Sequence, residues 1–193
     1  GLAYLLLKRN ICQGFGMDCN PELIAAAQNN TAKLGFSDRF ALHTGELADT
    51  RFLENLRMEA SPVQLVMANP PWRLVGSGRL PATEARRKAL FGDKGTFPLF
   101  ASAASSLLEE DGRFACIISP DRLQDMLAAL NGAGLTPYLL QYIHKQKTSP
   151  ATFVLIEARK GAHAKPSVAE PIALYGPERF FTLESLAFCP FLR

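Results

Sequence analysis

Short apolar runs alternate along the chain with longer segments that have helical spacing. The pattern predicts strands at 13–18, 39–44, 63–68, 113–119, 138–143 and 152–158, and helices at 2–8, 21–33, 97–108 and 121–130. Alternating strands and helices are typical of an α/β fold in which helices cover both faces of a mostly parallel sheet. We therefore expect a doubly wound sheet.

The helix at 21–33 has the clearest boundaries. Asn20 can cap its first turn, Pro21 suits the first helical position, and Glu22 favours the positive end of the helix dipole. Gly35 can end the helix in a left-handed conformation. These signals predict a short strand followed at once by a capped helix.

The last two predicted strands are joined by residues 144–151 only. A connection this short forces antiparallel pairing, so the sheet is expected to end in an antiparallel hairpin. The preceding helix at 121–130 is expected to be capped by Ser119 or a neighbour and to stop at Asn131 and Gly132.

The chain opens inside a predicted helix, with no strand before it. In a doubly wound sheet the first strand is central, and the turn after it builds the ligand site. We therefore expect the first strand to be missing from this chain. The whole of 1–193 is interpreted as one N-terminally truncated domain with a basic loop at 73–96 and a C-terminal extension at 162–193.

Composition narrows the possible classes of protein. The 193 residues are 48% hydrophobic and 20% charged, which argues against a disordered or collagen-like chain. No run of eighteen apolar residues occurs, so no membrane-spanning helix is expected. The four cysteines form no C-x-x-C motif and the three histidines are isolated, which favours a reduced, cytoplasmic protein without a metal site. The sequence leaves the oligomeric state open.

Charge is concentrated in two segments. The net charge is +3, but residues 73–94 and residues 145–165 each carry a net +4. Two basic segments on a mildly acidic body are typical of a surface that binds phosphates. The alternative is a solvated helix face around residues 84–88 that only keeps the protein soluble.

The motif Asn69-Pro70-Pro71-Trp72 follows an apolar strand directly, where doubly wound sheets bind ligands. The prolines fix the backbone and donate no hydrogen bonds. The Asn69 side chain and the Pro70 carbonyl can accept both hydrogens of one planar amine, and Trp72 offers a flat face for a base. The alternative is a turn that ends the strand, with Trp72 in the core.

Two acidic residues follow the first two strands of this chain. Asp18 stands where dinucleotide-binding sheets place an acid that accepts both ribose hydroxyls, although it could instead cap the helix. Glu46 follows the next strand and could reach the adenine end of a cofactor, or it could be a solvent-exposed residue of a turn.

These motifs resemble the class I S-adenosylmethionine-dependent methyltransferases that methylate amines and carry N-P-P-[YFW]. The segments 18–22, 69–72, 101–114, 119–123 and 151–161, with the basic loop at 73–94, together are most similar to the tRNA1(Val) adenine-N6 methyltransferase family. The resemblance implies a seven-stranded Rossmann-like sheet of order 3-2-1-4-5-7-6 with strand seven antiparallel. It also implies S-adenosyl-L-methionine as cofactor.

The resemblance also assigns residues. The catalytic motif would be Asn69, Pro70, Pro71 and Trp72, and the cofactor would be bound by Gly1, Asp18, Cys19, Glu46, Leu47 and Asn69. The basic loop would bind RNA through Arg73, Arg79, Arg86, Arg87 and Lys88. The family carries a glycine-rich loop, G-x-G-x-G, after its first strand, and in this chain Gly1 could be the last glycine of that loop.

The implied function is methylation of an exocyclic amine of an RNA base, with adenine N6 in tRNA as the first candidate. A protein glutamine or a guanine amine of ribosomal RNA would use the same motif. A non-catalytic relative that binds RNA is the alternative from another class, and the incomplete glycine loop would agree with it. The two basic segments favour a nucleic acid over a protein substrate.

Overall fold

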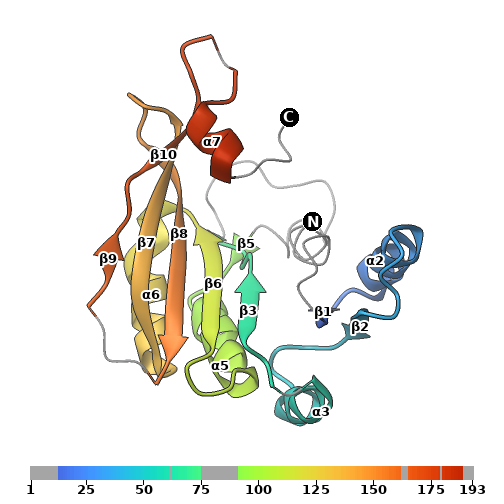
Figure 1. The fold of residues 1–193 in the computed structure, drawn as a ribbon. Coiled ribbons are helices and arrows are strands. Elements are labelled where there is room, and N and C mark those ends of the chain that lie inside the picture. The colour runs from blue at the N-terminus through green and yellow to red at the C-terminus, as the bar shows by residue number, and fades with distance from the viewer. Residues whose placement is uncertain (1–12, 61, 75–90, 162–164, 179, 189–193) are drawn as a thin grey trace. The chain divides into compact units, whose positions relative to one another are not determined.

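The computed structural model describes residues 13–60, 62–74, 91–161, 165–178 and 180–188 (Figure 1). The chain divides into two compact units, Gly1–Pro62 and Val63–Arg193. The helix expected at 2–8 lies outside the described residues. Among the helices of the described ranges, none combines the length and the apolar character needed to cross a bilayer.

The first unit is a small β-α-β-α arrangement. It consists of β1 (Gly14–Asp18), α2 (Pro21–Lys33), β2 (Phe40–Thr44) and α3 (Thr50–Ala60). The two strands pair in parallel, with Gly14 opposite Phe40 and Asp18 opposite Thr44. The strands predicted at 13–18 and 39–44 and the helix predicted at 21–33 are confirmed to within one residue at each end.

The boundaries of α2 follow the predicted chemistry. The Asn20 side chain accepts a hydrogen bond of 2.9 Å from the backbone N–H of Glu22, so Asn20 is the N-cap. Gly35 follows the C-cap with φ of +71°, a left-handed conformation that costs glycine little. Local sequence therefore determines both ends of this helix.

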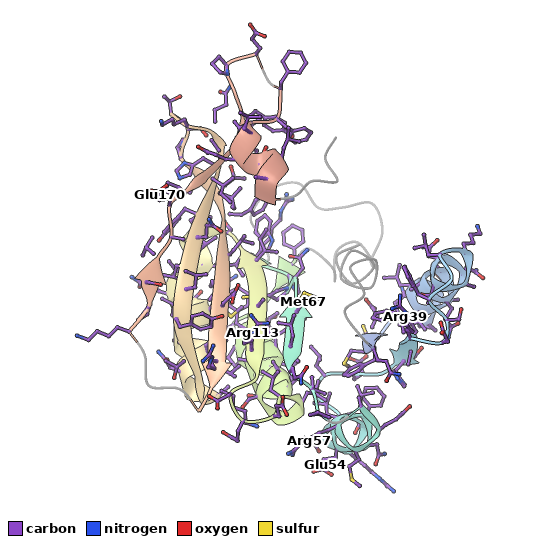
Figure 2. All side chains as sticks on the ribbon, in the orientation of Figure 1. Arg39, Glu54, Arg57, Met67, Arg113 and Glu170 are labelled. Carbon is purple, nitrogen blue, oxygen red and sulfur yellow. The ribbon has the colours of Figure 1, made fainter. Side chains whose placement is uncertain are left out.

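Helix α3 was not predicted, although its signals are present in the sequence. The carboxylate of Asp49 accepts a hydrogen bond of 2.9 Å from the N–H of Phe52 at its first turn. Leu53 and Leu56 are buried, while Glu54 and Arg57 are exposed (Figure 2). A Cβ atom on Gly45 would lie 2.4 Å from the Phe52 ring, so a larger residue there would displace this ring from its position against Gly45.

The second unit is built on a six-stranded sheet. Its strands are β3 (Leu65–Ala68), β6 (Arg113–Ile118), β7 (Leu135–Gln146), β8 (Ala151–Lys160), β9 (Ser167–Val168) and β10 (Ile172–Tyr175). The order is β10-β7-β8-β6-β3, and β9 also pairs with β7. Met67 on β3 and Arg113 on β6 are labelled in Figure 2. Strand β3 is parallel to β6, whereas β8 is antiparallel to both β6 and β7.

The antiparallel hairpin predicted at the end of the sheet is therefore confirmed. The order β3-β6-β8-β7 also agrees with the 4-5-7-6 part of the expected strand order. The short strands β9 and β10 were not predicted; they pair in parallel with β7 and lie in the segment 162–193. They are too short to show a period of their own, and pairing with β7 stabilises them.

Helices α5 (Thr96–Leu107) and α6 (Leu123–Gly132) pack against each other on the same face of the sheet (Figure 1). The helix expected at 121–130 is observed as a single 3₁₀ turn, η1 (Pro120–Arg122), followed directly by α6. Ser119 stands at the N-cap position but does not cap the backbone, because its hydroxyl is hydrogen-bonded to the Asp121 carboxylate instead. A short helix, α7 (Leu183–Phe188), follows β10.

The core of the second unit lies between the sheet and these two helices. Every second residue of β8 from Val154 to Ala158 is buried, as expected for a strand with one covered face. The Lys160 ammonium donates hydrogen bonds of 2.9 and 2.8 Å to the carbonyl oxygens of Ser105 and Leu108 at the end of α5. The fully buried side chains include Phe97, Phe114, Ile118, Met126, Leu130, Val154 and Ile156.

Candidate active site

The motif Asn69-Pro70-Pro71-Trp72 begins at the carboxyl end of β3, as the sequence predicts. Pro70 is fully buried, whereas Asn69 is exposed and Trp72 is half-buried. Among the described residues, the Asn69 side chain has no hydrogen-bond partner. A rigid, buried proline therefore anchors an exposed amide whose oxygen is available to a ligand.

The indole of Trp72 contacts two side chains. The Phe153 ring on β8 meets it edge to face, with ring centroids 6.1 Å apart at 73°. The Arg73 guanidinium lies over the indole at 5.3 Å from its centroid. Trp72 and Arg73 are consecutive in the chain, and the structure shows that the first cation of the basic loop lies against the aromatic ring of the motif.

The backbone of the motif is held by two further residues. The Arg122 guanidinium donates a hydrogen bond of 2.9 Å from Nη1 to the carbonyl oxygen of Trp72. Gly92 approaches the Pro71 carbonyl so closely that a Cβ atom there would lie 2.5 Å from that oxygen. Arg122 thus bonds to the backbone of the motif, and the lack of a side chain at Gly92 lets that segment pack closely against it.

The two ends of the basic segment come together beside the motif. Strand β4 (Arg73–Leu74) pairs in parallel with β5 (Phe91–Gly92), with Arg73 opposite Phe91. The side chain of Phe91 is buried. The remaining predicted RNA-binding residues, Arg79, Arg86, Arg87 and Lys88, lie outside the described residues.

In the first unit, the parallel register brings the ends of β1 and β2 to the same edge. Asp18 lies opposite Thr44, and its carbonyl oxygen accepts a hydrogen bond of 3.1 Å from the N–H of Gly45. One carboxylate oxygen of Asp18 accepts a hydrogen bond of 2.8 Å from the N–H of Asn20. The Asp18 side chain thus stabilises the turn before α2, while Asn20 is the residue that caps the helix.

The other predicted cofactor residues of this unit follow the same strand ends. Cys19 and Glu46 are exposed, and Leu47 is half-buried. Gly1 lies outside the described residues. The arrangement leaves acidic and polar side chains accessible at the edge where parallel sheets of this class bind ligands.

Sequence reasoning missed three residues that hold the motif: Gly92, Arg122 and Phe153. Their contacts with the motif join positions far apart in the chain, so no local pattern marks them. Residues 119–123 contribute to the family resemblance, but that resemblance assigns no role to Arg122. Within the described ranges, no three His, Cys, Asp or Glu side chains come together as a metal site would require.

Cys116, the cysteine in the described part of the second unit, is not suited to act as a nucleophile. Burial in β6 raises the pKa of the Cys116 thiol to about 12. A thiol with so high a pKa holds almost no thiolate near neutral pH, so Cys116 is a core residue.

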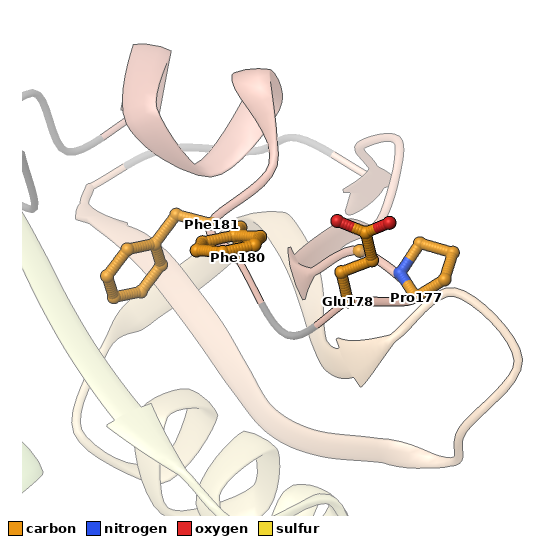
Figure 3. A pocket seen from close by; sticks show the side chains of 5 residues that line it. Pro177, Glu178, Phe180 and Phe181 are labelled. Carbon is orange, nitrogen blue, oxygen red and sulfur yellow. The ribbon is translucent and has the colours of Figure 1, made fainter.

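An aromatic depression lies between β10 and α7, apart from the motif. It has a volume of about 290 Å³ and is lined by Gly176, Pro177, Glu178, Phe180 and Phe181 (Figure 3). The Phe181 ring stacks on Tyr175 with centroids 5.0 Å apart. None of the predicted catalytic or cofactor-binding residues lines this depression.

Curated proteins with similar sequences carry one description. Two proteins from two strains of Porphyromonas gingivalis, each described as tRNA1(Val) (adenine(37)-N6)-methyltransferase, are 32% identical to the chain over 130 residues. The match covers 65% of this chain and 49% of each relative, so the chain spans about half the length of the curated relatives it matches. No family model matches the chain.

Solved structures show the same architecture. A predicted O-methyltransferase from Agrobacterium tumefaciens matches with a TM-score of 0.66 and 19% identity, over 88% of this chain and 73% of that one. A geranyl diphosphate C-methyltransferase from Streptomyces coelicolor, solved with S-adenosyl-L-homocysteine, matches with a TM-score of 0.52 and 10% identity, over 82% of this chain and 66% of that one. The chain therefore has a Rossmann-like methyltransferase fold, and its sequence is similar to tRNA1(Val) adenine-N6 methyltransferases.

Proposed function

We propose that the chain belongs to an S-adenosylmethionine-dependent N-methyltransferase that methylates an exocyclic amine of an RNA base, with adenine N6 in tRNA as the first candidate. The observation that carries this proposal is the motif at the end of β3. It combines an accessible amide oxygen, a backbone fixed by prolines and an aromatic ring. The sequence similarity to tRNA methyltransferases supports the choice of substrate.

The motif suits an amine that is a poor nucleophile. The lone pair of an adenine amine is delocalised into the ring, so the nitrogen must become pyramidal before it attacks. The amide oxygen of Asn69 and the carbonyl oxygen of Pro70 can each accept one of its hydrogens. Fixed acceptors of this kind favour the pyramidal nitrogen and stabilise the positive charge that develops on it.

The ring of Trp72 supplies a face on which a base can stack. A base must leave its own stack to enter such a site, and an unpaired loop base is the least costly to extrude. Arg73 lies next to the ring and is the first cation of the basic segment. A phosphate beside the extruded base would therefore meet a positive charge.

The residues of the first unit fit the cofactor. Asp18 stands at the carboxyl end of a parallel strand, and its second carboxylate oxygen can accept hydrogen bonds from ribose hydroxyls. The exposed carboxylate of Glu46 follows the adjacent strand and suits the adenine end. When bound, S-adenosylmethionine would supply an electrophilic methyl group on a sulfonium. With tRNA as the proposed substrate, we propose a cytoplasmic location for the reaction.

The test is transfer of a labelled methyl group from S-adenosylmethionine to separate tRNA, ribosomal RNA and protein fractions by the complete gene product. Label recovered as N6-methyladenine in tRNA supports the proposal. Label on a protein glutamine or on a guanine amine of ribosomal RNA would keep the chemistry and change the substrate. RNA binding without transfer to any fraction would identify a non-catalytic relative.

A further inference from the structure

Arg122 is a charged residue from a distant segment of the chain that bonds directly to the backbone of the candidate motif. It lies in η1, and only 4% of its surface is exposed. Its guanidinium donates to the Trp72 carbonyl from Nη1, donates to the Asp125 carboxylate from Nε at 2.8 Å, and lies over the Phe97 ring at 4.5 Å. We propose that Arg122 is a positioning residue that fixes the orientation of Trp72 in the substrate site, a role that rests on the proposed function.

The burial and the hydrogen bonds of Arg122 indicate that this side chain does more than fill space in the core. A buried guanidinium is costly unless it is paired and hydrogen-bonded, and an apolar side chain of similar size would fill the same volume at lower cost. Its carboxylate partner, Asp125, is 62% exposed, so water competes for that carboxylate and the ion pair contributes little. The contact that is specific to arginine is the planar fork that joins Asp125 to the Trp72 carbonyl.

The geometry around Trp72 explains what this contact achieves. The direction of a side chain is set by the two peptide planes that flank its Cα atom. The plane before Trp72 contains the Pro71 carbonyl, against which Gly92 packs. The plane after it contains the Trp72 carbonyl, which Arg122 holds. With both planes restrained, the Cα–Cβ bond of Trp72 has a fixed direction, and the edge contact with Phe153 then restricts the rotation of the indole about that bond.

A fixed indole matters because the base must be oriented before the transfer. Misplacement of a reacting group by about 1 Å can reduce a rate by about 100-fold. Asn69 is separated from Trp72 only by the two prolines, so a rotation at Trp72 would change the angle between the stacked base and the Asn69 acceptor. Arg122 would therefore affect turnover without touching the substrate.

The chain offers a direct probe, because Trp72 is its single tryptophan. We expect the Arg122→Met variant of this chain to shift the emission of Trp72 and to increase its quenching by acrylamide, with an unchanged far-ultraviolet circular dichroism spectrum. The matched control is Arg159→Met, which removes an exposed arginine that lies over the Tyr138 ring at 5.3 Å. The control should leave the emission of Trp72 unchanged.

The second readout is the rate of methyl transfer in the complete gene product. Arg122→Met should lower kcat by about 10- to 100-fold, while the affinity for S-adenosylmethionine stays within about twofold of the unchanged protein. Arg122→Lys keeps the charge and one donor, so it should recover part of both the rate and the native emission. If Arg122→Met fails to fold, Arg122→Lys decides with the same two measurements.

Native emission in Arg122→Met, or a native rate despite altered emission, would overturn the positioning role. If Arg122→Met does not fold and only Arg122→Lys can be measured, native emission together with a native rate in Arg122→Lys would overturn the positioning role as well. A complete gene product that transfers no methyl group, even without substitution, would overturn the proposed function and with it the role in catalysis. The fluorescence measurement does not depend on activity, so the two failures can be told apart.

Discussion

The ends of β1 and β3 carry the two halves of the candidate chemistry, but they are stabilised in different ways. At the end of β1, the Asp18 carboxylate accepts a hydrogen bond from the N–H of Asn20, two residues further along the chain, and its carbonyl oxygen accepts one from Gly45, which directly follows β2. At the end of β3, the motif is held by Gly92, Arg122 and Phe153, which come from three other segments of the chain.

This difference has a chemical reason. A ribose diol needs one accessible carboxylate, and a short turn suffices to place it. An amine that must be made pyramidal needs acceptors and a ring at fixed angles, which only tertiary contacts from several directions can provide. We therefore expect substitutions near β1 to act on cofactor binding and those near β3 to act on turnover.

The strongest test is Asn69→Ala. Loss of one fixed acceptor should lower the rate of methyl transfer by about 100-fold or more, while the affinity for S-adenosylmethionine stays nearly unchanged. Single-turnover kinetics and calorimetry measure the two quantities. Asn131→Ala, at an exposed asparagine in α6, is the matched control and should behave like the unchanged protein. Native turnover in Asn69→Ala would remove the motif from the site.

Asp18→Ala should show the opposite pattern. The ribose hydroxyls lose a charged acceptor, and hydrogen bonds to charged groups contribute about 1.5–3 kcal/mol each, so affinity for S-adenosylmethionine should fall by about 10- to 100-fold. Calorimetric titration measures this. Asp38→Ala removes an exposed acid of the same unit and should leave the affinity unchanged. If Asp18→Ala and Asp38→Ala bind S-adenosylmethionine with equal affinity, Asp18 only stabilises the turn before α2.

Neutralising Arg86, Arg87 and Lys88 tests the basic segment that comes after the motif in the chain. If these cations bind RNA phosphates, tRNA affinity should fall, and its dependence on salt should flatten by a slope of about 0.7 for each lost contact with single-stranded RNA. Affinity measured at three salt concentrations gives the slope.

The matched control for this triple variant neutralises Lys33, Arg51 and Arg57, which are exposed on α2 and α3. It changes the net charge by the same amount outside the basic segment. Equal salt slopes for both variants and the unchanged protein would support the solvated helix face and would favour a protein glutamine as substrate.

The same contrast explains how far the sequence could predict the molecule. The Asn20 cap, the Gly35 stop and the strand before Asn69 depend on neighbouring residues, so they could be read from the sequence. Helix α3 could have been found from the Asp49 cap and the spacing of Leu53 and Leu56. Local rules were enough for these elements because their stabilising bonds are local.

The supports of the motif could not be predicted in this way. The contact of Arg122 with the Trp72 carbonyl exists only because η1 and the end of β3 are brought together by the parallel pairing of β6 with β3. The requirement for glycine at position 92 likewise comes from a carbonyl in another segment. Such contacts depend on the tertiary structure, which no spacing in the sequence encodes directly.

The smallest expected effect concerns the sheet of the second unit. Burial and a hydrogen bond to Glu157 raise the pKa of Tyr138 above its usual value of 10, although Arg113 acts in the opposite direction. The folded state then holds the phenol proton more tightly than the unfolded chain does. The resulting stabilisation is complete below pH 10 and is lost as the pH rises from there through the raised pKa.

Tyr138→Phe removes this titration. Urea unfolding from pH 7 to pH 11 should show a stability difference between the two proteins that is constant up to about pH 10 and then shifts in favour of the phenylalanine variant. A difference that stays constant across the whole range would mean that Tyr138 titrates alike in the folded and unfolded states.

The β7–β8 hairpin also has a consequence for the order of folding. Its strands pair up to the turn between Gln146 and Ser149. Two hydrogen bonds of 2.9 Å stabilise this turn: the N–H of Ser149 donates to the carbonyl oxygen of Gln146, and the N–H of Gln146 donates to the Ser149 hydroxyl oxygen. By contrast, β3 pairs with β6, and the whole segment from 69 to 112 separates these two strands in the chain. Closing a long loop costs more chain entropy than closing a short one. The hairpin should therefore form first, with its amide protons protected before those of β3, and the strand that ends at Asn69 should join the sheet late.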